Sequence, residues 1–137
     1  MSQPMLEYRI EEEGPVYTEL WLLDDRPHRE DGPACVMRRT ADGAVGFELW
    51  YREGRLHRND GPAALHYDFE SGRVTQAHYF QDGAPARQDD GPESLEFDAQ
   101  TGRLRNAAWI RDNEAQSLTL TRWLWLTRAR AGDTPLD

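Results

Sequence analysis

Three stretches of the sequence place an arginine and an aspartate just before a Gly-Pro pair, and two of them add a histidine. They read PHREDGPA at 27–34, LHRNDGPA at 56–63 and ARQDDGPE at 86–93. Histidine next to aspartate could supply the general base and acid of a hydrolase, or could bind a metal ion. The residues concerned are His28, His57, Asp31 and Asp60. Whether these stretches perform chemistry or form a structural corner decides whether to expect an enzyme.

Each residue type in these stretches also has a structural explanation. Aspartate caps a turn, glycine accepts the positive φ of a sharp reversal, and proline fixes φ where the next strand begins. The preceding arginines (Arg29, Arg58 and Arg87) can pair with turn carboxylates. We therefore predict a structural turn motif made of Asp31, Gly32, Pro33, Asp60, Gly61, Pro62, Asp90, Gly91 and Pro92.

The chemical alternatives are weaker. The histidine spacing resembles no established metal motif, and the third stretch has Ala86 where the histidine would stand. Cys35 follows a Gly-Pro-Ala strand entry in only one stretch, and a small buried residue explains it equally well. We expect no catalytic residue, no metal and no cofactor, with a hydrolase that uses the histidines and aspartates as the less favoured alternative.

The chain has 137 residues and a formal net charge of -9, which predicts one acidic domain with a modest core. Nucleic acid and anionic membranes would repel this charge, so we expect neither as a direct partner. It would suit a protein with a basic surface. A lone cysteine rules out a disulfide within the chain, and Met1 to Ile10 show no signal-peptide pattern, so we expect a cytoplasmic protein.

Two independent markers keep the same period along the chain. The Gly-Pro pairs that begin at positions 32, 61 and 91 are 29 and 30 residues apart. An aromatic row recurs at 29, 29 and 30 residues: Trp21, Trp50, Tyr79 and Trp109. A shared period is typical of a repeat protein, in which each unit completes its core against its neighbours.

Within one unit the stretches 47–51 and 63–67 are short, apolar and bounded by turn signals, which indicates two strands. We predict a mainly β, single-domain antiparallel meander of about three and a half units of 29–30 residues. Residues 1–16 would form an edge strand and a partial unit, residues 17–110 the repeats, and residues 111–137 a C-terminal cap and tail.

Alternation along the strands divides the side chains between two faces. We expect the face with Leu20, Phe47, Leu49 and Tyr51 to be the core, matched by Val36, Leu65 and Leu95 from the second strand of each unit. The opposite face would carry the aromatic row together with Glu19 and Glu48. This aromatic and acidic strip is either a second packed layer or an exposed protein-binding surface.

The C-terminal segment contains Trp123 and Trp125 and needs burial. We expect a helix from about Glu114, because Asp112 or Asn113 could cap it, while alternation in 117–126 leaves a strand open. The segment would cap the repeat stack or form an oligomer contact, including a homodimer contact.

The unit FELWYREGRLH at 47–57 resembles the MORN repeat in its first aromatic residue, its turn glycine and its histidine, which are Phe47, Gly54 and His57. Tyr51 stands at the tryptophan position and Leu49 replaces the central glycine. The HRxDGPA stretch resembles a variant found in bacteriophage and bacterial proteins. The resemblance implies a curved β-hairpin scaffold or binding surface without catalytic residues, and related repeats include proposed antitoxins.

The function expected from the sequence is therefore that of a non-enzymatic protein-binding module. Its acidic and aromatic surface would inhibit a host defence or nucleic-acid-processing complex by filling a basic cleft, as a phage-type inhibitor does. The alternatives are an antitoxin or immunity-like protein and a self-assembling scaffold.

Overall fold

The computed structural model describes residues 5–89, 91–111 and 114–118. Within these ranges the chain is mainly β-strand and contains no helix, so no helix there could cross a membrane. The strands are β1 (Leu6–Glu13), β2 (Val16–Leu23), β3 (Arg26–Pro27), β4 (Cys35–Arg39), β5 (Val45–Leu49), β6 (Tyr51–Arg52), β7 (Arg55–Leu56), β8 (Ala64–Tyr67), β9 (Val74–His78), β10 (Phe80–Gln81), β11 (Ala84–Pro85), β12 (Ser94–Phe97), β13 (Leu104–Arg111) and β14 (Glu114–Leu118).

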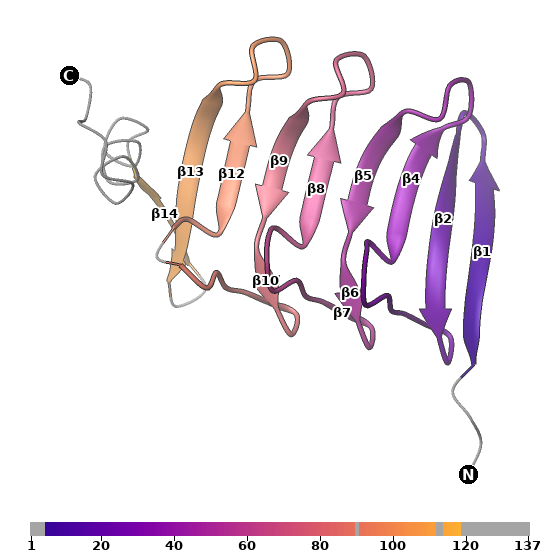
Figure 1. Ribbon diagram of the computed structural model, residues 1–137. Coiled ribbons are helices and arrows are strands. Elements are labelled where there is room, and N and C mark those ends of the chain that lie inside the picture. Colours follow the sequence, from indigo (N-terminus) through magenta and orange to yellow (C-terminus); the bar gives the residue numbers. More distant parts are fainter. Residues whose placement is uncertain (1–4, 90, 112–113, 119–137) are drawn as a thin grey trace.

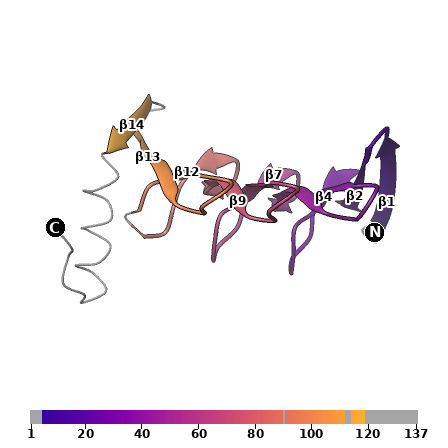
Figure 2. The same cartoon turned by 90° about the horizontal axis from the view of Figure 1, so that it is seen from above.

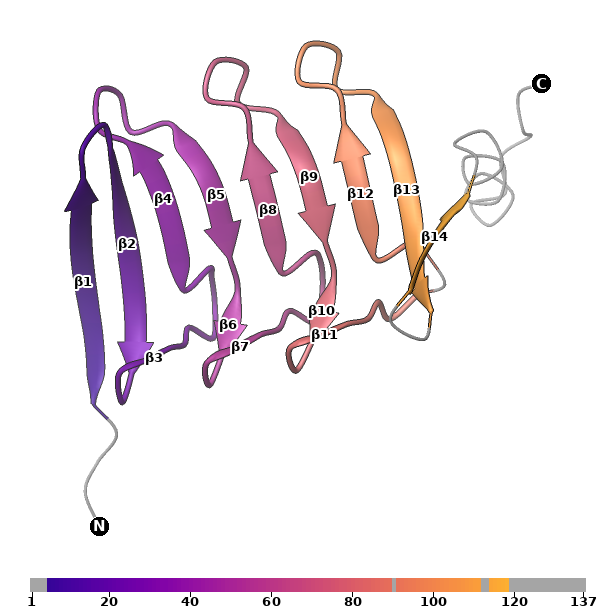
Figure 3. The same cartoon turned by 180° about the vertical axis from the view of Figure 1, so that it is seen from behind.

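The long strands form one antiparallel sheet in the order β1-β2-β4-β5-β8-β9-β12-β13-β14, with β3 added to β2 (Figure 1). Seen from above, these strands follow one another in a single row (Figure 2). Two small hairpins, β6–β7 and β10–β11, lie along one end of the sheet, where the chain crosses from one strand pair to the next (Figure 3). The predicted antiparallel meander is confirmed at this level.

Left-handed turn residues reverse the chain between strands. Glu53 and Gly54 have φ values of 49° and 81°, and Asp82 and Gly83 have 48° and 84°, as a two-residue type I′ hairpin turn requires. At the other end of the sheet, Gly43, Gly72 and Gly102 have φ values of 76°, 73° and 76°. The turn signals in the sequence therefore mark real reversals.

The glycines of the Asp-Gly-Pro stretches are a different case. Gly32, Gly61 and Gly91 are not among the described residues with positive φ, so our expectation that these glycines supply a left-handed turn is wrong. The chain there is a crossing segment rather than a tight reversal. The reason for glycine at these positions lies in an arginine side chain, as shown below.

The best-buried cluster lies on the face that carries the aromatic row. Leu95 pairs with Ala77 on one side and Ala107 on the other, and these residues have exposures of 7%, 4% and 0%. Leu65 pairs with Ala77 and with Glu48, so it shares the same face. Small alanines let Leu65, Tyr79 and Phe97 pack over this part of the sheet.

Our assignment of the core to the face with Leu20, Phe47 and Leu49 is therefore wrong in part. The large side chains of that face are only half-buried, apart from Leu22. Val36 and Leu65 lie opposite Glu19 and Glu48, on the aromatic face, because a register difference of one residue moves a strand's side chains to the other face.

The predicted C-terminal helix can be compared with the structure at residues 114–118, and there the prediction is wrong. Residues 114–118 form β14, which pairs antiparallel with β13 (Glu114 opposite Arg111, and Leu118 opposite Ala107), so no helix begins at Glu114. Pairing with β13 overrides the local capping signal. Trp123 and Trp125 lie outside the described residues.

Candidate functional site

An arginine covers each of three aromatic rings in the row. The guanidinium carbon of Arg29 lies 4.0 Å from the ring centroid of Trp21, that of Arg58 3.8 Å from Trp50, and that of Arg87 4.1 Å from Tyr79. These distances allow a cation–π interaction. The rings are half-buried, and the arginine of each HRxDGPA-type stretch is the lid over its ring.

The other side of each guanidinium is closed by the glycine and proline of the same stretch. The Nη1 atoms of Arg29, Arg58 and Arg87 donate to the carbonyl oxygens of the prolines at 3.2, 3.2 and 2.9 Å, the acceptors being Pro33, Pro62 and Pro92. A Cβ added at Gly32, Gly61 or Gly91 would lie 2.9, 2.9 or 2.5 Å from the guanidinium carbon. Glycine is therefore required for close approach.

The two motif histidines hold turns in the following unit. The Nδ1 atom of His28 accepts a hydrogen bond from the backbone N–H of Glu53 at 2.8 Å, and that of His57 accepts one from Asp82 at 3.0 Å. Both donors are the first residues of type I′ turns. Each imidazole therefore links one crossing segment to the next hairpin, rather than facing the other histidine across a shared metal site.

The motif carboxylates pair with the arginines at the surface. Arg29 Nε lies 3.6 Å from Asp31 Oδ1, and Arg58 Nε lies 3.1 Å from Asp60 Oδ1. In the third stretch Arg87 pairs with Asp89, while Asp90 lies outside the described residues. One extra residue between arginine and glycine accounts for the spacing of 30 rather than 29 at this point.

The glutamates of the predicted strip are engaged within the sheet. Glu19 accepts hydrogen bonds from the Tyr8 hydroxyl at 2.7 Å and from Arg38 Nε at 2.5 Å. Burial alone would raise the pKa of Glu19, but these two donors outweigh it and lower the pKa. Glu48 accepts from the Tyr67 hydroxyl, whose pKa is raised by burial and by this contact.

The fourth ring of the row, Trp109, lies on β13 and is half-buried. The indole nitrogen of Trp50 is buried without a hydrogen-bond partner among the described residues, which fits a ring held mainly by packing and by Arg58. The aromatic row thus lies along one face of the sheet, on the side of Glu19 and Glu48. Its first three members lie beneath arginines.

One serine and one histidine on the opposite face lie within hydrogen-bonding distance. Ser94 Oγ is 2.9 Å from His78 Nδ1, and His78 Nε2 is 3.3 Å from the amide oxygen of Gln76. Burial, with a smaller contribution from His66, lowers the pKa of His78. An amide rather than a carboxylate faces the second ring nitrogen, so the described residues do not assemble a Ser-His-Asp triad here.

A reactive cysteine and a metal site find no more support than the triad. Burial raises the pKa of the Cys35 thiol, which disfavours the reactive thiolate. Among the residues that the structure describes, no group of three or more histidine, cysteine or acidic side chains could hold a metal ion.

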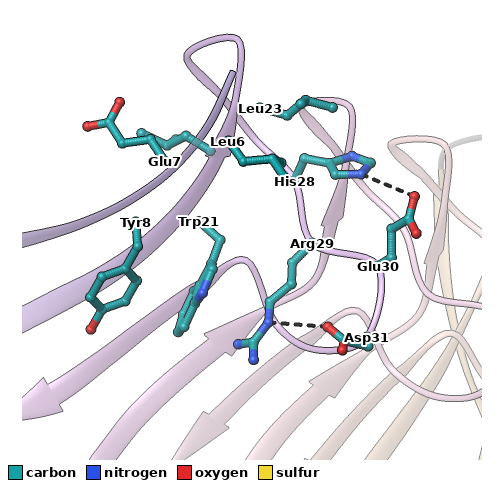
Figure 4. A pocket seen from close by; sticks show the side chains of 10 residues that line it. Leu6, Glu7, Tyr8, Trp21, Leu23, His28, Arg29, Glu30 and Asp31 are labelled. Carbon is teal, nitrogen blue, oxygen red and sulfur yellow. Dashed lines mark ion pairs between the residues drawn. The ribbon is translucent and has the colours of Figure 1, made fainter. Parts of the chain in front are cut away.

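An open groove of about 1030 Å³ lies at the β1 end of the sheet (Figure 4). Its apolar side is formed by Leu6, Tyr8 and Trp21, and its polar side includes Glu30 and Asp31, which are exposed. The Tyr8 and Trp21 rings are 5.0 Å apart, and Arg29 lies over Trp21. Apolar contact area and exposed carboxylates therefore occur together at this end.

Of the residues that line this groove, sequence reasoning singled out Trp21 but missed Leu6 and Tyr8. It also missed Ile10, an exposed residue of the same strand. Their exposures of 76%, 50% and 51% are high for large apolar side chains. The signal was present in the sequence, since 6–10 alternates apolar and charged residues. It indicated an edge strand without showing that the apolar side stays uncovered among the described residues.

No family model matches this chain, and searches of curated proteins and of solved structures also find no match.

Proposed function

We propose that this protein is a non-enzymatic binding module that uses the groove at the β1 end of its sheet to hold a basic segment of another protein. The observation that carries the proposal is the convergence of exposed apolar side chains with exposed carboxylates in that groove. Leu6 and Tyr8 supply the apolar side, and the exposed Glu30 and Asp31 supply the carboxylates. Apolar contact gives affinity, while charge complementarity gives on-rate and orientation.

The rest of the molecule supports a scaffold for that groove. The recurring arginine stacks and histidine-capped turns give structural roles to the arginines and histidines of the motif, which were the candidates for catalysis or metal binding. MORN-like units, about three and a half of them, would fit this division between a repeated frame and a binding end. With a net charge of -9, the module would suit a nuclease or defence complex, whose activity it would block by holding a basic segment of that target.

A capture experiment with matched charge variants tests this proposal. Immobilised wild-type protein, Glu30→Lys and Glu96→Lys are exposed to one cell lysate, and bound proteins are identified across a salt titration. Glu30 lines the groove, whereas Glu96 is an exposed glutamate on β12. We expect a basic protein that moderate salt releases, that Glu30→Lys fails to retain and that Glu96→Lys retains as the wild type does.

Two results would count against a groove-binding module. Capture of nothing that depends on Glu30 would remove the groove as the binding site. A partner lost equally from both variants would indicate attraction to overall charge rather than to this site.

A further inference from the structure

Strand β1 lies at one edge of the sheet that the structure describes. Among the described residues its only strand neighbour is β2. The backbone N–H of Asp24 donates to the carbonyl of Met5 at 3.0 Å, so the main-chain groups of Met5 face β2. Because these groups alternate along an antiparallel strand, those of Leu6, Tyr8, Ile10 and Glu12 point away from β2. An exposed edge of this kind can pair with another strand.

The side chains of β1 sort by chemistry onto its two faces. Leu6, Tyr8 and Ile10 lie opposite Leu23, Trp21 and Glu19, on the face of the aromatic row. The other face carries Glu7, Arg9, Glu11 and Glu13. A strand added to this edge would therefore meet an apolar row on one face and a mainly acidic row on the other.

A second copy of this chain fits the edge poorly. Antiparallel pairing of two β1 strands about Arg9 would place Glu7 opposite Glu11 twice and Arg9 opposite itself. Pairing about Ile10 would place Glu7 opposite Glu13 twice, which offsets the two favourable pairs of Arg9 with Glu11. The register centred on Tyr8 pairs Glu7 with Arg9 but spans only Leu6 to Ile10. Each copy also carries a net charge of -9. These charges favour a basic partner.

We propose that β1 binds its partner by strand addition, and that the added segment alternates apolar residues with lysine or arginine. The apolar residues lie beside Leu6, Tyr8 and Ile10, and the cations lie beside Glu7, Glu11 and Glu13, with a neutral residue opposite Arg9. This inference rests on the proposed function and names the class of segment that the module holds. Main-chain hydrogen bonds along the edge provide binding, and the alternation provides selectivity.

The probe is a capped synthetic octapeptide, Lys-Arg-Lys-Val-Ser-Val-Lys-Val, designed to run antiparallel to β1. Two N-methylated versions share its side chains. One is methylated on the three valines, whose N–H groups would face β1, and the other on the second and third lysines and the serine, whose N–H groups would face away. Fluorescence anisotropy gives the affinity of each peptide for the wild-type protein.

We expect the unmodified peptide to bind, outward methylation to change the affinity by less than about threefold, and inward methylation to weaken it by about tenfold or more. Ile10→Pro should weaken binding well beyond Ile10→Ala, because it removes an outward N–H that would donate to the added strand. The variant should still fold, since proline is tolerated at an edge position whose N–H faces solvent. Glu11→Lys should weaken binding by about threefold or more at low salt.

Failure of the unmodified peptide to bind, or equal effects of the two methylation patterns, would overturn strand addition. Sedimentation showing dimers that Ile10→Pro dissociates would assign the edge to a second copy and would also overturn it. Neither result touches the groove itself, since capture that depends on Glu30 in the lysate experiment would still support a binding module. Because the methylation test uses wild-type protein, it stands even if Ile10→Pro fails to fold.

Discussion

Arg58 lies over the ring of Trp50, with 3.8 Å between the guanidinium carbon and the ring centroid. Its Nη1 donates to the Pro62 carbonyl, and its Nε faces Asp60. The guanidinium is thus in contact with a ring, a backbone carbonyl, a carboxylate and the Gly61 backbone, and the Arg58 side chain keeps only 21% of its surface exposed. The contacts of Arg29 and Arg87 repeat this pattern.

Removing this arginine should destabilise the fold. Arg58→Ala should lower the free energy of unfolding by about 1–2 kcal/mol, because it removes a stacked cation and uncovers Trp50. Arg58→Lys should recover less than half, since an ammonium cannot stack flat and donate sideways. Urea denaturation measures both. Arg103→Ala, at an exposed turn, should stay within about 0.5 kcal/mol of the wild type, and an equal loss there would argue against the stack.

Loss of a motif histidine should loosen one turn rather than abolish a reaction. In His57→Ala the backbone amide of Asp82 loses its acceptor, so its hydrogen exchange should accelerate by about fivefold, as expected for roughly 1 kcal/mol. The amide of Glu53, held by His28, serves as the internal control and should not change. Residue-resolved exchange by NMR would show this. Equal acceleration at both amides would mean that the substitution acts globally.

The exposed ion pair between Arg39 and Asp42 should make the stability of the fold depend on pH in the acidic range. The contact with Arg39, followed by the hydrogen bond from Ala44 N–H, lowers the pKa of Asp42 from its ordinary 3.8 to about 2. A carboxyl whose pKa is lower in the folded state stabilises the fold above its unfolded pKa, and this contribution is lost as pH falls through the folded value. The difference in melting temperature between wild type and Asp42→Asn should therefore be constant above about pH 5 and shrink towards pH 2.

This measurement belongs at low ionic strength, because salt screens exposed pairs. Asp60→Asn offers a comparison at another exposed carboxylate that faces an arginine. A difference that grows as the pH falls would contradict the stated sign for Asp42.

Much of the frame follows from local sequence. The turn signals at Glu53-Gly54 and Asp82-Gly83 specify backbone conformation directly, so the meander and its aromatic row could be predicted. The face assignment could not, because it depends on the register that sets Leu65 opposite Glu48 rather than Leu49. Periodicity within one strand carries no information about its offset from the next.

The site shows the same limit. Gly61 is required by the close approach of the Arg58 guanidinium, a contact that depends on how this side chain folds back over its own segment. The residue types alone suggested a positive φ as the reason for the glycine. Pairing with β13 made 114–118 a strand although the capping signals favoured a helix. The exposure of Tyr8 likewise depends on what covers β1, which no local pattern encodes.

Whether the recurring motif packs or catalyses is tested most directly by the coupling between Gly61 and Arg58. Gly61→Ala should cost about 1 kcal/mol of unfolding free energy in the wild type, because its Cβ displaces the guanidinium, and close to nothing in Arg58→Ala. Gly72→Ala is the control. Gly72 has a φ of 73° and no atom within 4 Å of an added Cβ, so that substitution should cost the same in both backgrounds. A cost for Gly61→Ala that persists without Arg58 would contradict the packing role.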